Sequence, residues 1–208
     1  RGYKVGETKT VDMGTYGTHT LRIANTSTPS ECSTEGFSQT ACGFVLEFAD
    51  IITTHNMNRS ATNFGGWPSS TMRTFVNNDI YNLLPDTLKS GIIDTTIISN
   101  GSSSSSKVVV TSTDKLYLPS TAEIYTSGSM YDGAASATRQ FDYYANLNVT
   151  SRNLTEAIKK NGDTESWWWM RSIRGGTDTF FLVGNSGTFL DTVPASTSGG
   201  VSPAFRIG

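Results

Sequence analysis

Hydrophobic side chains gather most densely in the last fifth of the chain, where residues 167–170 read Trp-Trp-Trp-Met and residues 180–183 read Phe-Phe-Leu-Val. A buried aromatic side chain removes roughly 150–250 Å² of surface from water, so these runs predict the centre of the core. Successive side chains of a strand face opposite ways, and here both faces are apolar. We therefore expect two central strands of a small antiparallel sheet, with a hairpin turn at residues 184–187 leading to a strand at 188–190.

The first half of the chain alternates between apolar runs and polar stretches. A loose alternation over residues 3–23 predicts a β-hairpin, and the apolar run at residues 44–48 predicts a further strand. Residues 24–42 between them are rich in Thr, Ser, Asn and Pro, which is typical of a loop. We expect this loop to lie outside the core.

The clearest helix is expected from about Ser70 to Leu84, where apolar residues recur at spacings of three, four and eight. The residues on that face are Met72, Phe75, Val76, Ile80, Leu83 and Leu84. Ser70 can cap the first turn, and Pro85 cannot continue the helix because it has no backbone N–H. A second, shorter helix is expected from Asp86 toward Ile92 and Ile93.

The rest of the chain predicts short strands. Residues 94–99 and 107–112 read as two strands around a serine-rich loop, and residues 115–120 as another short strand. Residues 121–125 predict one helical turn, and residues 205–207 are expected to pair with the first strand region. Strands, then two helices, then strands give the α+β class.

Length and charge narrow the classes of function. The 208 residues suit one domain, 1–208, and the net charge is −2, so no basic surface favours nucleic acid or an anionic membrane. Charged residues make up 16% of the chain, against a usual ~25%, and Gly, Ser and Thr are plentiful, as in many secreted β-rich domains. There is no apolar run long enough to insert into a membrane and no signal-peptide core at the start. We expect a soluble chain that is a mature or excised piece of an exported protein.

Cys32 and Cys42 are the only cysteines, with nine residues between them in a polar segment. A pair without histidine neighbours or Cys-x-x-Cys spacing argues against zinc, and a disulfide suits an exported protein. We therefore predict a Cys32–Cys42 disulfide.

Residues for catalysis or metal binding form no recognisable cluster. His19 and His55 stand apart from any Ser or Cys in a catalytic motif. Four carboxylates near the aromatic runs leave a glycosidase pair open without favouring it: Asp163, Glu165, Asp178 and Asp191. No sugar-lectin calcium motif is present, so we predict no cofactor, and calcium has no support.

Four motifs of the chain stand out: the opening residues 3–9 (Tyr-Lys-Val-Gly-Glu-Thr-Lys), the run at 65–73 (Gly-Gly-Trp-Pro-Ser-Ser-Thr-Met-Arg), and the C-terminal Trp-Trp-x-x-Arg-Ser and Gly-Val-x-Pro-Ala-Phe-Arg-Ile. Together they resemble a family of uncharacterised extracellular domains of bacterial surface proteins and phage. The closing segment also resembles the end of C-type-lectin-like domains, including formylglycine-generating enzymes and retroelement-diversified proteins. The resemblance implies a C-type-lectin-like fold. Formylglycine-generating enzymes use cysteines in the C-terminal part of the fold for their oxidase chemistry. That activity is not expected here, because no cysteine follows Cys42.

From this we expect a non-catalytic extracellular module that binds a glycan or a surface protein through loops beside the best-packed strands. The expected ligand-binding residues are Tyr131, Asp132, Tyr143, Arg174, Thr177, Asp178, Asp191 and Thr192. The expected structural core residues are Trp67, Met72, Phe75, Trp168, Arg171, Phe181 and Phe205. The alternatives are a polysaccharide hydrolase that uses C-terminal-loop carboxylates and a structural spacer in a multidomain adhesin.

Overall fold

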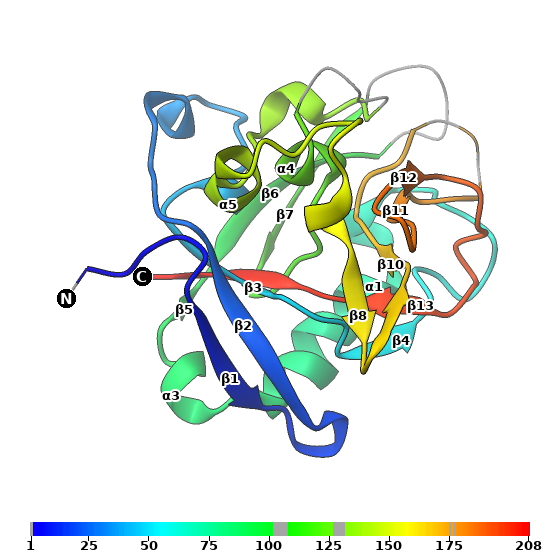
Figure 1. Ribbon diagram of the computed structural model, residues 1–208. Helices are drawn as coiled ribbons and strands as arrows, with labels where there is room; N and C mark the ends of the chain where they lie inside the picture. Colours follow the sequence, from blue (N-terminus) through cyan, green and yellow to red (C-terminus); the bar gives the residue numbers. More distant parts are fainter. Residues whose placement is uncertain (1, 102–107, 127–131, 175, 177) are drawn as a thin grey trace.

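The computed structural model describes residues 2–101, 108–126, 132–174, 176 and 178–208. It is a mixed α+β structure in which short helices surround several small sheets (Figure 1). This is the α+β class that the sequence predicts.

The first sheet has five strands in the order β1-β2-β3-β14-β5, all antiparallel to their neighbours. Their bounds are β1 Thr8–Asp12, β2 Thr18–Asn25, β3 Phe44–Phe48, β14 Ala204–Ile207 and β5 Ile92–Ile93. The predicted N-terminal hairpin is therefore present. The expected pairing of the C-terminal strand is wrong in its partner, because Phe205 pairs with Leu46 of β3 and Arg206 with Ile93 of β5. The two ends of the chain nevertheless contribute to one sheet.

The second sheet has the order β12-β11-β10-β13-β4 and holds the aromatic runs. Its strands are β12 Phe189–Leu190, β11 Leu182–Val183, β10 Trp168–Trp169, β13 Gly199–Val201 and β4 Thr53–His55. Trp168 and Trp169 are buried on opposite faces of the central strand, as expected. The sheet is not purely antiparallel, because β10 and β13 run parallel. A Cβ on Gly200 would lie 2.6 Å from the Trp167 carbonyl oxygen, so this close pairing needs glycine.

The predicted long helix is three connected segments: α1 Thr71–Phe75, a π-helical turn Val76–Ile80 and α2 Tyr81–Leu83. The Ser70 side chain caps it by accepting a hydrogen bond from the Arg73 N–H at 3.1 Å. The π-helical turn was not predicted. The side-chain amides of Asn77 and Asn78 donate to the carbonyls of Arg73 and Thr74, at 3.0 and 2.8 Å, and so compete with the α-helical ladder.

After Pro85 the short helix α3 spans Asp86–Lys89 and then ends. Ile92 and Ile93 form β5 rather than an extension of the helix, because they pair with β14. The next two strands, β6 Thr95–Asn100 and β7 Val109–Asp114, form the predicted hairpin. Residues 115–120 are not a strand: Tyr117 makes only an isolated bridge to Ala204. The predicted helical turn is α4 Thr121–Ile124.

Two further features were not predicted from the sequence. One is the helix α5 Asp142–Asn146, and the other is a hairpin of β8 Lys159–Asn161 and β9 Thr164–Ser166. Tyr144 of α5 and Lys159 of β8 are both buried against the first sheet, and both interact with Glu47 of β3. These two elements are held by buried polar contacts, so their sequences lack the apolar periodicity from which a helix or a strand is predicted.

The loop at residues 24–42 is tied by the predicted Cys32–Cys42 disulfide, which the structure confirms. The expectation that this loop lies outside the core is wrong for its second half. Thr40 and Ala41 are fully buried, and the Thr40 carbonyl accepts a hydrogen bond from the Tyr117 hydroxyl at 2.6 Å. Hydrogen bonds to buried partners explain how such a polar segment enters the core.

Candidate functional site

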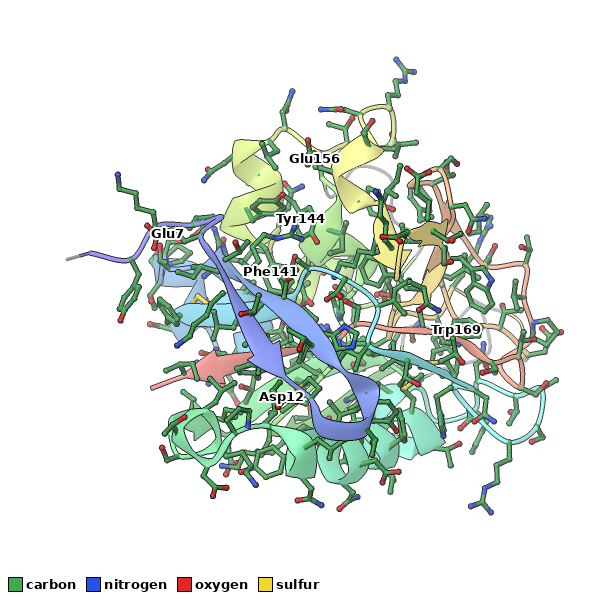
Figure 2. The ribbon with its side chains drawn as sticks, turned by 60° about the horizontal axis from the view of Figure 1, so that its bottom comes forward. Glu7, Asp12, Phe141, Tyr144, Glu156 and Trp169 are labelled. Atoms are coloured by element: carbon green, nitrogen blue, oxygen red, sulfur yellow. A yellow bond between two sulfur atoms is a disulfide. The ribbon has the colours of Figure 1, made fainter. Side chains whose placement is uncertain are left out.

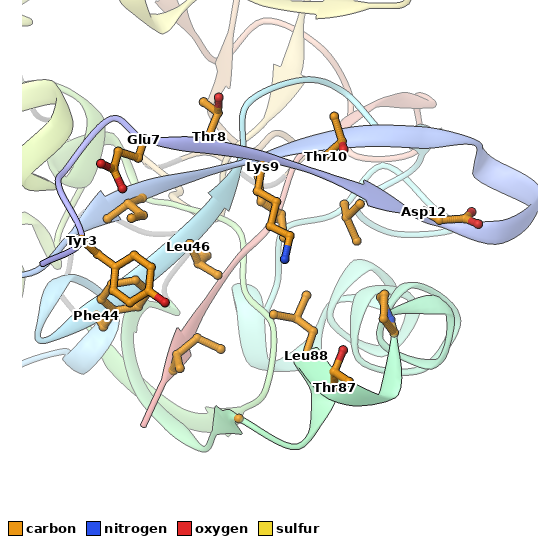
Figure 3. Close-up of a pocket in the computed structure, with 16 residues that line it drawn as sticks. Tyr3, Glu7, Thr8, Lys9, Thr10, Asp12, Phe44, Leu46, Thr87 and Leu88 are labelled. Carbon is orange, nitrogen blue, oxygen red and sulfur yellow. The ribbon is translucent and has the colours of Figure 1, made fainter. Parts of the chain in front are cut away.

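A groove of about 870 Å³ lies on one face of the first sheet, between β1 and α3 (Figure 3). Val76 and Ile80 of the long helical stretch belong to the same buried core as Leu21 and Phe48 of the sheet. Pro85 ends that stretch and α3 has only four residues, so the helices leave part of the sheet face uncovered.

Strand register makes the floor of the groove apolar. Ile23 pairs with Leu46, Leu46 pairs with Phe205, and Phe44 pairs with Ile207, so all five side chains share one face. Ile23 and Phe205 are buried, whereas Phe44, Leu46 and Ile207 are half-buried and line the open space. The floor therefore offers apolar surface to a ligand, as most ligand pockets do.

Lys9 is the cation of the groove lining. It pairs with Leu21 in the register of β1 and β2, so its side chain is on the floor side of the sheet. Figure 3 shows the Lys9 side chain directed across the groove toward Leu88 of α3, while Thr8 points to the opposite side of the strand. Lys9 is exposed and forms no ion pair within the described part of the chain. The lining also holds the acidic residues Glu7 and Asp12, so a negative charge is favoured only directly opposite Lys9.

The rim beside Lys9 is an open strand edge. The Ile23 N–H donates to the Glu7 carbonyl and the Met13 N–H to the Gly17 carbonyl, both at 2.9 Å. Antiparallel pairs alternate, so residues 7, 9, 11 and 13 bond to β2 and the backbone groups of residues 8, 10 and 12 point away from it. Those three residues line the groove and form no backbone hydrogen bond to another element in the described structure.

The two ends of the groove differ. At one end Tyr3, which is 73% exposed, sets its ring against Phe44 in an edge contact of 5.8 Å between centroids. At the other end the β1–β2 turn meets the helical stretch, since a Cβ on Gly14 would lie 3.2 Å from Leu83. In Figure 2, Glu7 labels the residue before β1 and Asp12 the last residue of β1. The aromatic ring of Tyr3 therefore borders one end of the groove, and the β1–β2 turn lies beyond the other.

Behind the sheet, the opposite face of β3 carries a buried charged network. Glu47 is ion-paired with Arg22, and it accepts a hydrogen bond from the Tyr144 hydroxyl at 2.8 Å. Burial alone would raise the pKa of Glu47, but Lys159 and Arg22 bring it below its ordinary value. Arg22 also lies 3.9 Å from the centroid of the Tyr143 ring. These contacts hold β2, β3 and α5 together and keep the groove floor in place.

A second buried pair, Arg171 with Glu123, lies in the other half of the molecule. Burial raises the pKa of Glu123, but Arg171 more than offsets this and the pKa falls below its ordinary value. The pKa of Asp132 is raised by burial, and its carboxylate accepts a hydrogen bond from the Ala134 N–H at 2.9 Å. The two carboxylates that are paired with arginine, Glu47 and Glu123, therefore have lowered pKa values, whereas a general acid needs a raised pKa.

The structure divides the ligand-binding residues predicted from the sequence into separate regions. Arg174 and Asp191 approach each other at 3.7 Å, and the Asp178 carbonyl accepts a hydrogen bond from the Ala195 N–H at 2.7 Å, so their two loops adjoin. Thr192 is exposed on the second of these loops.

Asp132 and Tyr143 do not join that surface. Asp132 is buried beside Ser172, whereas Tyr143 packs on Arg22 at α5, which lies apart from β10 in both views (Figures 1 and 2). Tyr131 and Thr177 lie outside the described residues. Ligand binding by any of the eight stays a prediction.

The residues predicted as structural core are nearly all enclosed. Those that are buried are Trp67, Met72, Trp168, Arg171, Phe181 and Phe205. Phe75 is half-buried and stacks on His55, with 4.1 Å between ring centroids.

Both histidines have partners. His19 contacts the Asp50 carboxylate at 2.7 Å, and His55 donates to the Asn56 carbonyl at 2.6 Å. In the described ranges, no three His, Cys, Asp or Glu side chains are grouped to hold a metal. Among those same residues, no helix has the length and apolar character needed to cross a membrane.

The groove residues were not predicted from the sequence as a binding site. Lys9 and Val11 alternate within the predicted hairpin, and Phe44 and Leu46 alternate within the predicted strand, but periodicity does not tell a covered face from an open one. The available signal was Pro85, which ends the helix before it can cover the whole face.

A model of one protein family, described as a domain of unknown function (DUF6273), matches residues 44–208. The matched part includes the groove residues of β3, α3 and β14, whereas β1 and β2 precede it. No curated protein and no solved structure matches the chain.

Proposed function

The chain belongs to DUF6273, a family of domains of unknown function, and we propose that it is a non-catalytic binding module whose ligand occupies the groove between β1 and α3. The observation that carries the proposal is the half-buried apolar floor of Phe44, Leu46 and Ile207 beside an exposed strand edge. Concave sites lined mainly by apolar side chains, with a few polar groups, are typical of ligand-binding sites.

The proposed place of action is outside the cytoplasm, on a bacterial surface or a phage particle. The Cys32–Cys42 disulfide supports it, because disulfides persist in oxidising compartments. We also propose a C-type-lectin-like arrangement, which the sharing of one sheet by the N-terminal hairpin and β14 supports.

The adjoining C-terminal loops are a second candidate surface for a glycan or protein ligand. The observation in their favour is that the Asp178 carbonyl and the Thr179–Pro194 bridge fasten one loop to the other. A surface held in this way can bind through its side chains without relying on them for its shape.

The test is a combined glycan and peptide array probed with the chain and two variants. Leu88→Arg places a charged side chain at the groove, while Leu147→Arg makes the same change at an exposed leucine of the α5 end. We expect an array ligand to bind the wild type and Leu147→Arg and to lose affinity for Leu88→Arg. Equal binding by both variants would contradict the groove site.

The same array distinguishes the other functions. A ligand that is cleaved, with release of a product, would identify a hydrolase instead. A chain that binds neither a glycan nor a peptide on the array would fit a structural spacer.

A further inference from the structure

We propose that the ligand of the groove is an extended protein segment that adds a strand to the open edge of β1 and places a carboxylate opposite Lys9. This inference rests on the proposed function of the groove and names the chemistry of its ligand.

The edge determines the backbone of the ligand. Thr8, Thr10 and Asp12 present backbone N–H and C=O groups along the groove, and a peptide strand supplies complementary groups at the same spacing. At roughly 3.4 Å per residue, β1 offers an edge of about 17 Å, which matches a segment of about five residues. A glycan has no such regular repeat of donors and acceptors.

Lys9, Val11 and Leu88 determine the side chains. In the added strand, every second residue shares the face of Lys9 and Val11, the side on which Figure 3 shows Lys9 directed across the groove toward Leu88. The residue opposite Lys9 faces an exposed ammonium that has no ion pair in the described structure, so charge complementarity favours Asp or Glu there. The neighbouring inward residues are expected to be apolar.

The test uses immobilised peptides of about nine residues, long enough at roughly 3.4 Å each to overspan β1. Threonine occupies the outward positions, the central inward residue is Glu, and the other inward residues vary among Val, Leu and Phe. We expect members of this set to bind the full chain. Absence of binding across the set would overturn the inference, and so would a groove ligand from the glycan array alone, which would leave the proposed function standing.

Backbone methylation of the best peptide tests strand addition without changing the protein. Methylating the amides of the outward residues removes the groups that bond to β1 and is expected to weaken binding about tenfold or more, as loss of hydrogen bonds predicts. The matched control methylates the alternate amides and is expected to bind as before. Equal effects of the two patterns would overturn the inference.

A charge reversal tests the carboxylate. Lys9→Glu is expected to weaken binding of the Glu peptide about two- to fivefold, as for an exposed ion pair, and a Lys peptide is expected to recover the loss. If neither the protein variant nor the Lys peptide changes the measured affinity, Lys9 does not contact the ligand. Light scattering of the free chain distinguishes the remaining occupant, a second copy: a stable dimer blocked by Thr10→Pro would replace the peptide inference.

Discussion

Arg171 and Glu123 form a buried, two-pronged ion pair in which Nη1 lies 2.6 Å from Oε1 and Nη2 lies 2.7 Å from Oε2. Arg171 also donates to the Leu118 carbonyl at 2.9 Å, while the hydroxyls of Thr40 and Thr138 donate to Oε2 of Glu123. The pair therefore links the segment after β10 to α4 and to two loops that are distant in sequence.

Breaking this pair is expected to destabilise the fold strongly. Arg171→Met leaves the Glu123 carboxylate buried without its counter-charge, which costs roughly 3–5 kcal/mol of the free energy of unfolding. Urea unfolding measures the loss. As the control, Lys89→Met removes a pair with the exposed Asp86 and should change little. An unfolding midpoint of Arg171→Met equal to that of the wild type would refute a structural role.

The disulfide is expected to be complete and stabilising. Thiol titration in denaturant without reductant should detect no free thiol, since Cys32 and Cys42 are bonded to each other. Replacing both by Ser should cost roughly 2–3 kcal/mol by the loop-entropy estimate, measured by thermal unfolding. Two titratable thiols would contradict the prediction.

Trp168 should be far less replaceable than its neighbour Trp167. Trp168 is fully buried and its Nε1–H donates to the Ala157 carbonyl at 3.1 Å, whereas Trp167 is half-buried. Trp168→Ala is expected to cost roughly 3–5 kcal/mol, and Trp167→Ala less. Calorimetry compares the two, and equal melting temperatures would show that burial does not set their contributions.

The sequence predicted those parts of the fold in which apolar residues repeat with a clear period. Trp168 and Trp169 indicated a strand covered on both faces, and Met72, Val76 and Ile80 indicated the helix; all five are buried. In each case local spacing and tertiary burial favour the same structure.

Elements held by polar or long-range contacts were not predictable in this way. The Thr40 carbonyl accepts a hydrogen bond from the buried Tyr117 hydroxyl, and Ile93 lies in a strand because it pairs with β14. Lys159 is buried near the carboxylate of Glu47. The groove has the same origin, because it depends on how far a helix extends over a sheet and not on any local pattern.

Lys159 predicts a dependence of stability on alkaline pH. Burial and the nearby positive charge of Arg22 lower its pKa from 10.5 to about 8, and the negative charge of Glu47 offsets only part of this. Between these two pH values the unfolded chain binds more protons than the folded chain, so the contribution of Lys159 to the free energy of unfolding rises with pH.

Comparison with Lys159→Met isolates this effect. The stability of the wild type relative to the variant is expected to increase between pH 8 and about 9.5, below the ordinary range of tyrosine ionisation. The variant should fold, because the Phe48 carbonyl still accepts a hydrogen bond from the Ser202 hydroxyl at 3.0 Å. Parallel pH profiles from urea titrations would show that Lys159 does not titrate in this window.

The last prediction concerns the C-terminal loops as a second binding surface. Asp178 contributes to the fold through its backbone carbonyl, which accepts from the Ala195 N–H, and alanine keeps that carbonyl. Asp191 contributes an ion pair of 3.7 Å to the exposed Arg174, and such a pair adds little stability. Asp178→Ala with Asp191→Ala should therefore retain the circular dichroism spectrum and the melting temperature.

Once folding is shown to be unchanged, measurements of ligand affinity distinguish binding at the C-terminal loops from binding in the groove. A ligand held by the loops should lose affinity for the Asp178→Ala, Asp191→Ala variant and not for Leu88→Arg, while a ligand in the groove should behave in the opposite way. Asp163→Ala, an exposed carboxylate change at the β8–β9 turn, is the matched control. If every array ligand binds the loop variant as tightly as the wild type, the loops are not a binding surface, because their two tested carboxylates then contribute neither to folding nor to recognition.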